Sequence, residues 1–160
     1  MRRPLVMGIA LCLGIGMIGV AGTAGASTPV KKPPVKLSGT VNNKGTKTVK
    51  DGAVEVEADD YYFKSTFLKA PKGSTVAVTV KNESQTEHTF TADNGSFDEQ
   101  LAPGATATVN VTIPANGKPL AFHCSFHGST GMKGAFFSKA GGTAGKATTD
   151  TKSSGGGYGY

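Results

Sequence analysis

Cysteine and histidine are scarce in this sequence, and their scarcity limits what the chain can be. The 160 residues include two cysteines, at positions 12 and 124, and three histidines. Two cysteines cannot build the disulfide framework that stabilises many small exported domains. Three histidines leave no cluster for a second metal site, so hydrolase or oxidase chemistry has little support. We therefore expect a protein that is not an enzyme.

A helical repeat of apolar residues is also missing. Instead, short segments alternate between apolar and polar residues, as strands with one buried face do. Gly, Pro and Asn mark turns between these segments. The predicted strands cover residues 53–58, 75–80, 87–92, 106–113, 120–124 and 133–138, with bulky apolar residues over a bend at 61–68. This pattern predicts an all-β sandwich of about seven to eight strands.

The N-terminus has the pattern of a secretory signal. Arg2 and Arg3 precede an uncharged apolar run, and small residues follow as Ala24-Gly25-Ala26. Residues 1–26 are therefore predicted to be a signal peptide, which places the protein in the periplasm, outside the cell or at the cell envelope. An uncleaved segment would instead tether the protein to the membrane.

Charge and composition divide the rest of the chain into three parts. Residues 27–52 carry six Lys against one Asp and form a predicted Lys/Pro-rich linker, and residues 139–160 form a predicted disordered tail with a charge of +2. Between them, the predicted domain at 53–138 carries six Lys against nine acidic residues. The basic segments lack interleaved aromatic residues. They therefore favour contact with an anionic cell envelope over nucleic acid.

The chemistry is concentrated in residues 122–132, FHCSFHGSTGM, with the spacing C-x2-H-x4-M. Cys124, His127 and Met132 would lie in one loop between two strands. His88 lies near the start of the predicted upstream strand 87–92, where alternation turns it inward with the core. Alternation also turns His123 outward, so we expect His123 to lie on the surface and not to be a ligand.

A thiolate, two imidazoles and a thioether favour copper in both oxidation states. Zinc would gain little from the thioether. After signal cleavage Cys124 would be the only cysteine, and a metal would protect this thiol in an oxidising compartment. The plain alternative is a buried Cys that acts as a small hydrophobic residue. A cysteine nucleophile is disfavoured because no Asn or Asp is placed to orient His127.

The motif resembles the copper loop of plastocyanin-like cupredoxins, and the similarity extends over residues 53–138. The framework that resembles the family comprises G-x-x-V at 73–76, Asn82, H-T-F at 88–90, L-x-P-G at 101–104 and M-x-G at 132–134. The resemblance implies a Greek-key sandwich and one type 1 copper ion, with ligands His88, Cys124, His127 and Met132. It also implies one-electron transfer through an exposed His127, with Phe126 and Gly128 forming a small apolar docking surface.

Two departures from the family pattern affect this interpretation. His123 stands where plastocyanins have a Tyr associated with an acidic docking route, and Phe126 replaces the usual Pro of the loop. We expect an exported monomer that exchanges electrons with a redox protein, such as a cytochrome or a membrane oxidoreductase. The alternatives are a copper carrier or scavenger without electron transfer, and a copper-free structural domain.

Overall fold

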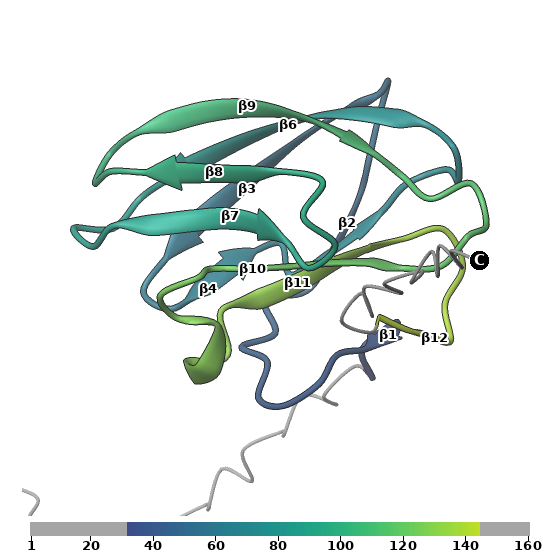
Figure 1. Ribbon diagram of the computed structural model, residues 1–160, viewed down its shortest axis with the longest axis horizontal. Helices are drawn as coiled ribbons and strands as arrows, with labels where there is room; N and C mark the ends of the chain where they lie inside the picture. Colours follow the sequence, from purple (N-terminus) through teal and green to yellow (C-terminus); the bar gives the residue numbers. More distant parts are fainter. Residues whose placement is uncertain (1–31, 145–160) are drawn as a thin grey trace, which may run out of the picture. The chain divides into compact units, whose positions relative to one another are not determined.

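The computed structural model describes residues 32–144, which fold into two facing β-sheets and a small third sheet (Figure 1). The six-stranded sheet contains, in spatial order, β2 (Thr46–Thr48), β5 (Phe67–Lys69), β11 (Lys133–Phe137), β10 (Leu120–His123), β7 (His88–Ala92) and β8 (Asp98–Leu101). The four-stranded sheet contains β4 (Tyr62–Lys64), β3 (Ala53–Asp59), β6 (Thr75–Asn82) and β9 (Thr106–Thr112). The third sheet pairs β1 (Val35–Lys36) with β12 (Gly142–Thr143).

The order of the strands confirms the predicted all-β, Greek-key sandwich. The chain moves from β6 in one sheet to β7 and β8 in the other, returns for β9, and then crosses back for β10 and β11. One 3₁₀ turn, η1 (Gly128–Thr130), interrupts the strands within residues 32–144. In this part of the chain no helix is long and apolar enough to cross a bilayer.

Alternation along the strands builds the core between the two larger sheets. In β6, Val76, Val78 and Val80 are fully buried, while the residues between them are partly exposed. Aromatic residues fill the centre, and the ring of Phe122 lies 4.8 Å from that of Phe90 between centroids. Burying a side chain of this size stabilises the fold by about 1.5–3 kcal/mol relative to leaving it exposed.

Strand β10 positions the residues of the predicted metal loop. It pairs with β7 on one side and β11 on the other, so that Phe122 lies opposite Ala92 and Gly134. Gly134 packs directly against the Phe122 ring and the Thr66 carbonyl, where a Cβ atom would overlap both. A glycine is therefore required where β11 leaves the metal loop.

The domain begins and ends beyond the predicted limits of 53 and 138. Residues 32–52, predicted as linker, instead contribute β1 and β2, and β2 extends the six-stranded sheet by pairing with β5. Val35 is buried in a second apolar cluster on the outer face of this sheet, together with Phe67, Ala121, Ala135, Phe137 and Ala144. The linker prediction failed here because these short strands gain their stability from distant partners and not from their own composition.

The strand count also exceeds the predicted seven to eight, because the structure adds short strands such as β4, β5 and β8. The predicted signal peptide (1–26) and most of the predicted C-terminal tail lie outside the described residues.

Candidate metal centre

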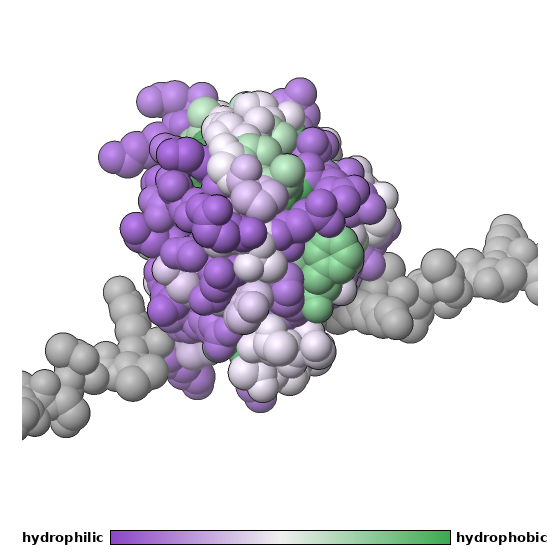
Figure 2. All heavy atoms as spheres, turned by 90° about the vertical axis from the view of Figure 1, so that its left-hand side faces the viewer, coloured by the Kyte–Doolittle hydropathy of each residue, from purple (hydrophilic) through white to green (hydrophobic). Residues whose placement is uncertain are grey.

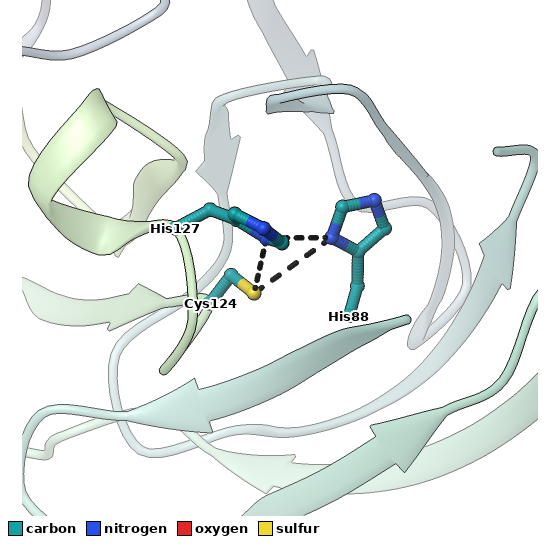
Figure 3. A group of neighbouring side chains, drawn as sticks. All are labelled: His88, Cys124 and His127. Atoms are coloured by element: carbon teal, nitrogen blue, oxygen red, sulfur yellow. Dashed lines mark hydrogen bonds between the residues drawn. The ribbon is translucent and has the colours of Figure 1, made fainter. Parts of the chain in front are cut away.

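Three side chains from two parts of the sandwich converge on one another (Figure 3). They lie at the end of the sandwich where β7 begins and β10 finishes, which Figure 1 shows as a ribbon. Cys124 Sγ lies 3.4 Å from His127 Nδ1 and 3.8 Å from His88 Nδ1. The two Nδ1 atoms are 3.2 Å apart. Among residues 32–144 these three side chains form the group whose donor atoms could hold a metal ion.

The distances fit a metal with a trigonal set of nitrogen and sulfur donors. Bonds of about 2.0–2.3 Å at an angle near 120° would separate such donors by roughly 3.5–3.8 Å. The observed 3.2–3.8 Å are close to this range. The donor atoms therefore already have the spacing that a single ion needs.

The loop after β10 presents Cys124 and His127 together because it closes into two tight turns. The Cys124 carbonyl accepts hydrogen bonds from the backbone N–H groups of His127, at 3.2 Å, and Gly128, at 2.7 Å. The His127 carbonyl accepts from Met132 N at 3.1 Å, and Cys124 N donates back to Met132 O at 3.0 Å. Gly131 allows the return with a φ of 105°, which favours glycine.

Met132 is brought beside Cys124 by this backbone pairing. Its side chain is fully buried in the cluster between the two large sheets, as is that of Cys124. The thioether is therefore kept from solvent on the core side of the loop. Its assignment as a ligand remains a prediction.

His88 is fully buried, and polar groups behind it determine which ring nitrogen faces the other donors. Its Nε2 lies 3.0 Å from Ser84 Oγ and 3.3 Å from Asp60 Oδ1. The Ser84 hydroxyl donates to Asn82 Oδ1 at 2.9 Å, so Ser84 Oγ can accept the Nε2–H of His88. This leaves the lone pair of Nδ1 directed at Cys124 and His127, as a ligand requires.

Burial, followed by the neighbouring His127, lowers the pKa of His88, while Asp60 opposes this shift. Both dominant effects disfavour the charged imidazolium. His88 is therefore neutral near pH 7, which is the form that binds a metal.

The Cys124 sulfur receives a hydrogen bond from the main chain. The Thr89 N–H donates to Sγ at 3.4 Å, a donor–acceptor distance suited to the large sulfur atom. Cys124 is buried and is the free cysteine among the described residues. A peptide N–H aimed at the sulfur helps to hold Sγ in place beside the two imidazoles.

His127 is the half-buried member of the group, and aromatic residues flank it. The ring of Tyr61 lies 4.4 Å from the His127 ring with a tilt of 37°, and the ring of Phe126 lies 6.2 Å away. Tyr61 and Phe126 are the exposed large hydrophobic residues of the described chain, at 41% and 53% exposure. Figure 2 views this end of the molecule, where small hydrophobic areas stand out from a mostly hydrophilic surface.

The positions of His123 and Gly128 can be compared with what the sequence predicted for them. His123 points to the opposite face of β10, where its Nδ1 lies 2.6 Å from Asp93 Oδ1, so it lies apart from the three donors as expected. Gly128 was predicted to be part of an exposed docking surface, but it is buried against the His123 ring. The prediction for Gly128 is wrong because η1 folds it back under the loop.

Sequence reasoning missed the residues that surround the donors. Ser84, Asp60 and Tyr61 lie in loops between strands, and nothing in their local sequence links them to a metal site. Asn82 carried a weak signal as part of the framework motif. Its side chain connects the Ser84 loop to the Leu101 carbonyl, with Nδ2 donating at 3.0 Å.

A β-sandwich that brings two His Nδ1 atoms and one Cys sulfur together at one end, with a Met beside them, fits a type 1 copper site. Comparison with known families agrees. Residues 37–136 match the model of the cupredoxin-like domain, and the chain belongs to this family.

Solved structures with a similar fold include copper proteins. The metal-binding domain of the Cu(I)-exporting P-type ATPase CopA from Streptococcus pneumoniae, solved with Cu(I), has a TM-score of 0.50 and 11% identity over 64% of this chain and 98% of its own. Reduced auracyanin from Roseiflexus castenholzii has a TM-score of 0.48 and 20% identity over 60% of this chain and 99% of its own.

Auracyanin A, a blue copper protein from Chloroflexus aurantiacus, has a TM-score of 0.47 and 18% identity over 59% of this chain and 100% of its own. A search of curated proteins finds no match to this chain.

Proposed function

We propose that the protein is an exported carrier of single electrons that uses one type 1 copper ion. The ligands would be His88 Nδ1, Cys124 Sγ and His127 Nδ1, with Met132 as a weak fourth ligand. The observation that carries the proposal is the convergence of one sulfur and two nitrogen donors, 3.2–3.8 Å apart, at the end of a sandwich core. Copper bound here would supply a change of one electron between Cu(I) and Cu(II).

The chain itself would contribute a fixed donor geometry. His88 is held by Ser84 and Asp60, Cys124 by the Thr89 N–H, and the loop by its paired backbone hydrogen bonds. A site that cannot rearrange freely needs little reorganisation when its charge changes by one. This rigidity favours electron transfer over storage of the metal.

Electrons would enter and leave through His127 and the neighbouring Phe126. Support comes from the partial exposure of His127 and the 53% exposure of Phe126, whereas His88 and Cys124 are buried. The partner would be a redox protein, such as a cytochrome or a membrane oxidoreductase, that gives or takes one electron. A single donor group within residues 32–144 supports a carrier with one copper over an oxidase that combines several.

The proposed location is the periplasm, the cell exterior or the cell envelope. Support comes from the signal pattern of residues 1–26 and from the single cysteine that would remain after cleavage. The lysines of residues 27–52 would favour an anionic envelope surface. Residues 1–26 can be fused in front of a reporter protein, and cell fractionation then tests the location. Mass spectrometry of the mature protein tests the cleavage.

A second candidate function is the carriage of copper without electron transfer. One specific observation favours it: the similar fold of the CopA domain is known with Cu(I) and belongs to a copper exporter. The same donors would serve both roles, so the two differ in how readily the metal leaves.

Optical and EPR spectra of the Cu(II) protein test the proposed site. We expect an intense blue absorption band from the Cys124 sulfur and its loss in Cys124→Ser. A colourless Cu(II) protein, or a Cys124→Ser variant that keeps the band, would refute the site. Reversible voltammetry with fast self-exchange would support the electron carrier, whereas rapid loss of copper to a chelator would support the copper carrier.

A further inference from the structure

The turn between β3 and β4 touches both imidazoles of the metal centre, although neither of its residues belongs to the proposed ligand set. Asp60 Oδ1 lies 3.3 Å from Nε2 of His88. Tyr61 lies over His127 with centroids 4.4 Å apart, and meets the His88 ring edge-on at 6.3 Å. Adjacent residues of one turn therefore contact both histidines from the solvent side.

Asn42 ties this turn to the metal loop. Its Nδ2 donates to the Tyr61 carbonyl at 2.7 Å and to the Thr130 carbonyl at 3.1 Å. Its backbone N–H donates to the Gly131 carbonyl at 2.9 Å. A Cβ atom at Gly131 would lie 3.0 Å from the Asn42 side chain, so the two segments are in close contact.

These contacts join three segments that are distant in the sequence into one unit. Asn42 comes from the segment between β1 and β2, and Tyr61 from the β3–β4 turn. Thr130 and Gly131 come from the metal loop. The backbone of Tyr61, from which the ring projects, is thus held by the same residue that bonds the metal loop.

We infer that Tyr61 is a cover on His127 that slows the exchange of copper with outside ligands, and that Asn42 is the positioning residue that holds this cover. For copper to leave toward an outside ligand, the half-exposed His127 must swing away from the other donors. The Tyr61 ring opposes this rotation because it lies against the imidazole in a tilted ring contact. An aromatic contact is worth about 0.5–1.5 kcal/mol beyond burial, which corresponds to about 2- to 12-fold in rate.

This inference rests on copper binding at the ligands proposed above, and it does not depend on an electron-transfer role. The contact is between rings, so a Phe at position 61 would preserve it.

The test is the rate at which Cu(I)-loaded protein gives up copper to excess bicinchoninate. Tyr61→Ala is expected to release copper about 2- to 12-fold faster than the wild type. Tyr61→Phe should stay within about twofold, because it keeps the ring. Tyr62→Ala is the matched control, since it removes a neighbouring aromatic ring that contacts Asp59 and Lys44 instead of the histidines.

Asn42→Ala provides a second route to the same result. It keeps the Tyr61 side chain but removes the two side-chain hydrogen bonds that position it, so release should again be faster. Equal rates for Tyr61→Ala and wild type would overturn the inference, as would a Tyr62→Ala variant as fast as Tyr61→Ala. If Tyr61→Ala fails to fold by circular dichroism, Asn42→Ala decides the matter.

A readout without copper separates this inference from the proposed function. In the apo protein, NMR of the His127 ring protons should show a ring-current shift that is lost in Tyr61→Ala and kept in Tyr61→Phe. A wild-type protein without a blue band would refute the type 1 site, while this shift would still report the contact between the two rings. Unchanged His127 signals in Tyr61→Ala would refute the cover alone.

Discussion

The substitution Ser84→Ala tests whether the polar groups behind His88 prepare it to bind metal. Ser84 is buried, and its Oγ lies 3.0 Å from His88 Nε2 and 2.9 Å from Asn82 Oδ1. It also accepts the Thr86 N–H at 3.0 Å. Removing one oxygen atom breaks all of these contacts and leaves almost no cavity, so the effect comes from hydrogen bonding and not from packing.

The magnitude follows from what the missing oxygen leaves behind. His88 Nε2 keeps only the longer contact to Asp60, and the Thr86 N–H loses the partner it has in Ser84. Leaving a buried polar group unsatisfied costs about 1–3 kcal/mol. The free energy of unfolding of the apo protein should therefore fall by about 1–3 kcal/mol. Copper affinity should fall in addition by about 10- to 100-fold, because the ring is no longer held for binding.

Urea denaturation of the apo protein measures the first effect, and competition with a chelator of known copper affinity measures the second. Ser129→Ala is the matched control, since Ser129 is an exposed serine in the same metal loop. If Ser84→Ala binds copper as tightly as the wild type, the hydrogen bond to Nε2 does not prepare His88. A loss of affinity equal to that of Ser129→Ala would refute the reasoning in the same way.

Three further predictions concern packing, pH and metal removal. Gly134→Ala places a methyl group against the Phe122 ring. It should lower the free energy of unfolding by about 1–3 kcal/mol, as measured by urea denaturation. An unchanged denaturation midpoint would contradict the observed packing. Burial and His127 hold the pKa of His88 below 6.5, so the unfolded chain takes up a proton first as the pH falls. The apo protein should therefore lose stability as the pH falls below about 6.5, and His88→Gln should remove this dependence. Copper at about 100 times its Kd should stabilise the wild type by about 2.7 kcal/mol in calorimetry, and a similar gain in Cys124→Ser would argue against the thiolate as a ligand.

Much of the framework could be predicted from the sequence because regular strands carry their own signature. The alternation of Val76, Val78 and Val80 with polar residues predicts a buried face at any position in a sheet, and β6 has it. The metal loop is also local: Cys124 and His127 are three residues apart, so one tight turn presents both donors. His88 could be added because alternation turns it toward the same core as Phe90.

Other features depend on partners that the local sequence does not specify. Residues 32–52 look like linker because their apolar content is low, yet Val35 finds a buried site against the outer face of the six-stranded sheet. Gly128 looks exposed in sequence, but the 3₁₀ turn buries it against His123. Such outcomes depend on packing between distant segments, which periodicity does not encode.

The sequence by itself determined the all-β class and pointed to the donors Cys124, His127 and His88, because both follow from the two-residue period of strands and from short-range spacing. Only the tertiary structure decided how those donors are held. Ser84 fixes the tautomer of His88, Thr89 supports the sulfur of Cys124, and Tyr61 covers His127 under the control of Asn42. These are single hydrogen bonds and ring contacts between loops, and their partners become neighbours only after the two sheets have packed.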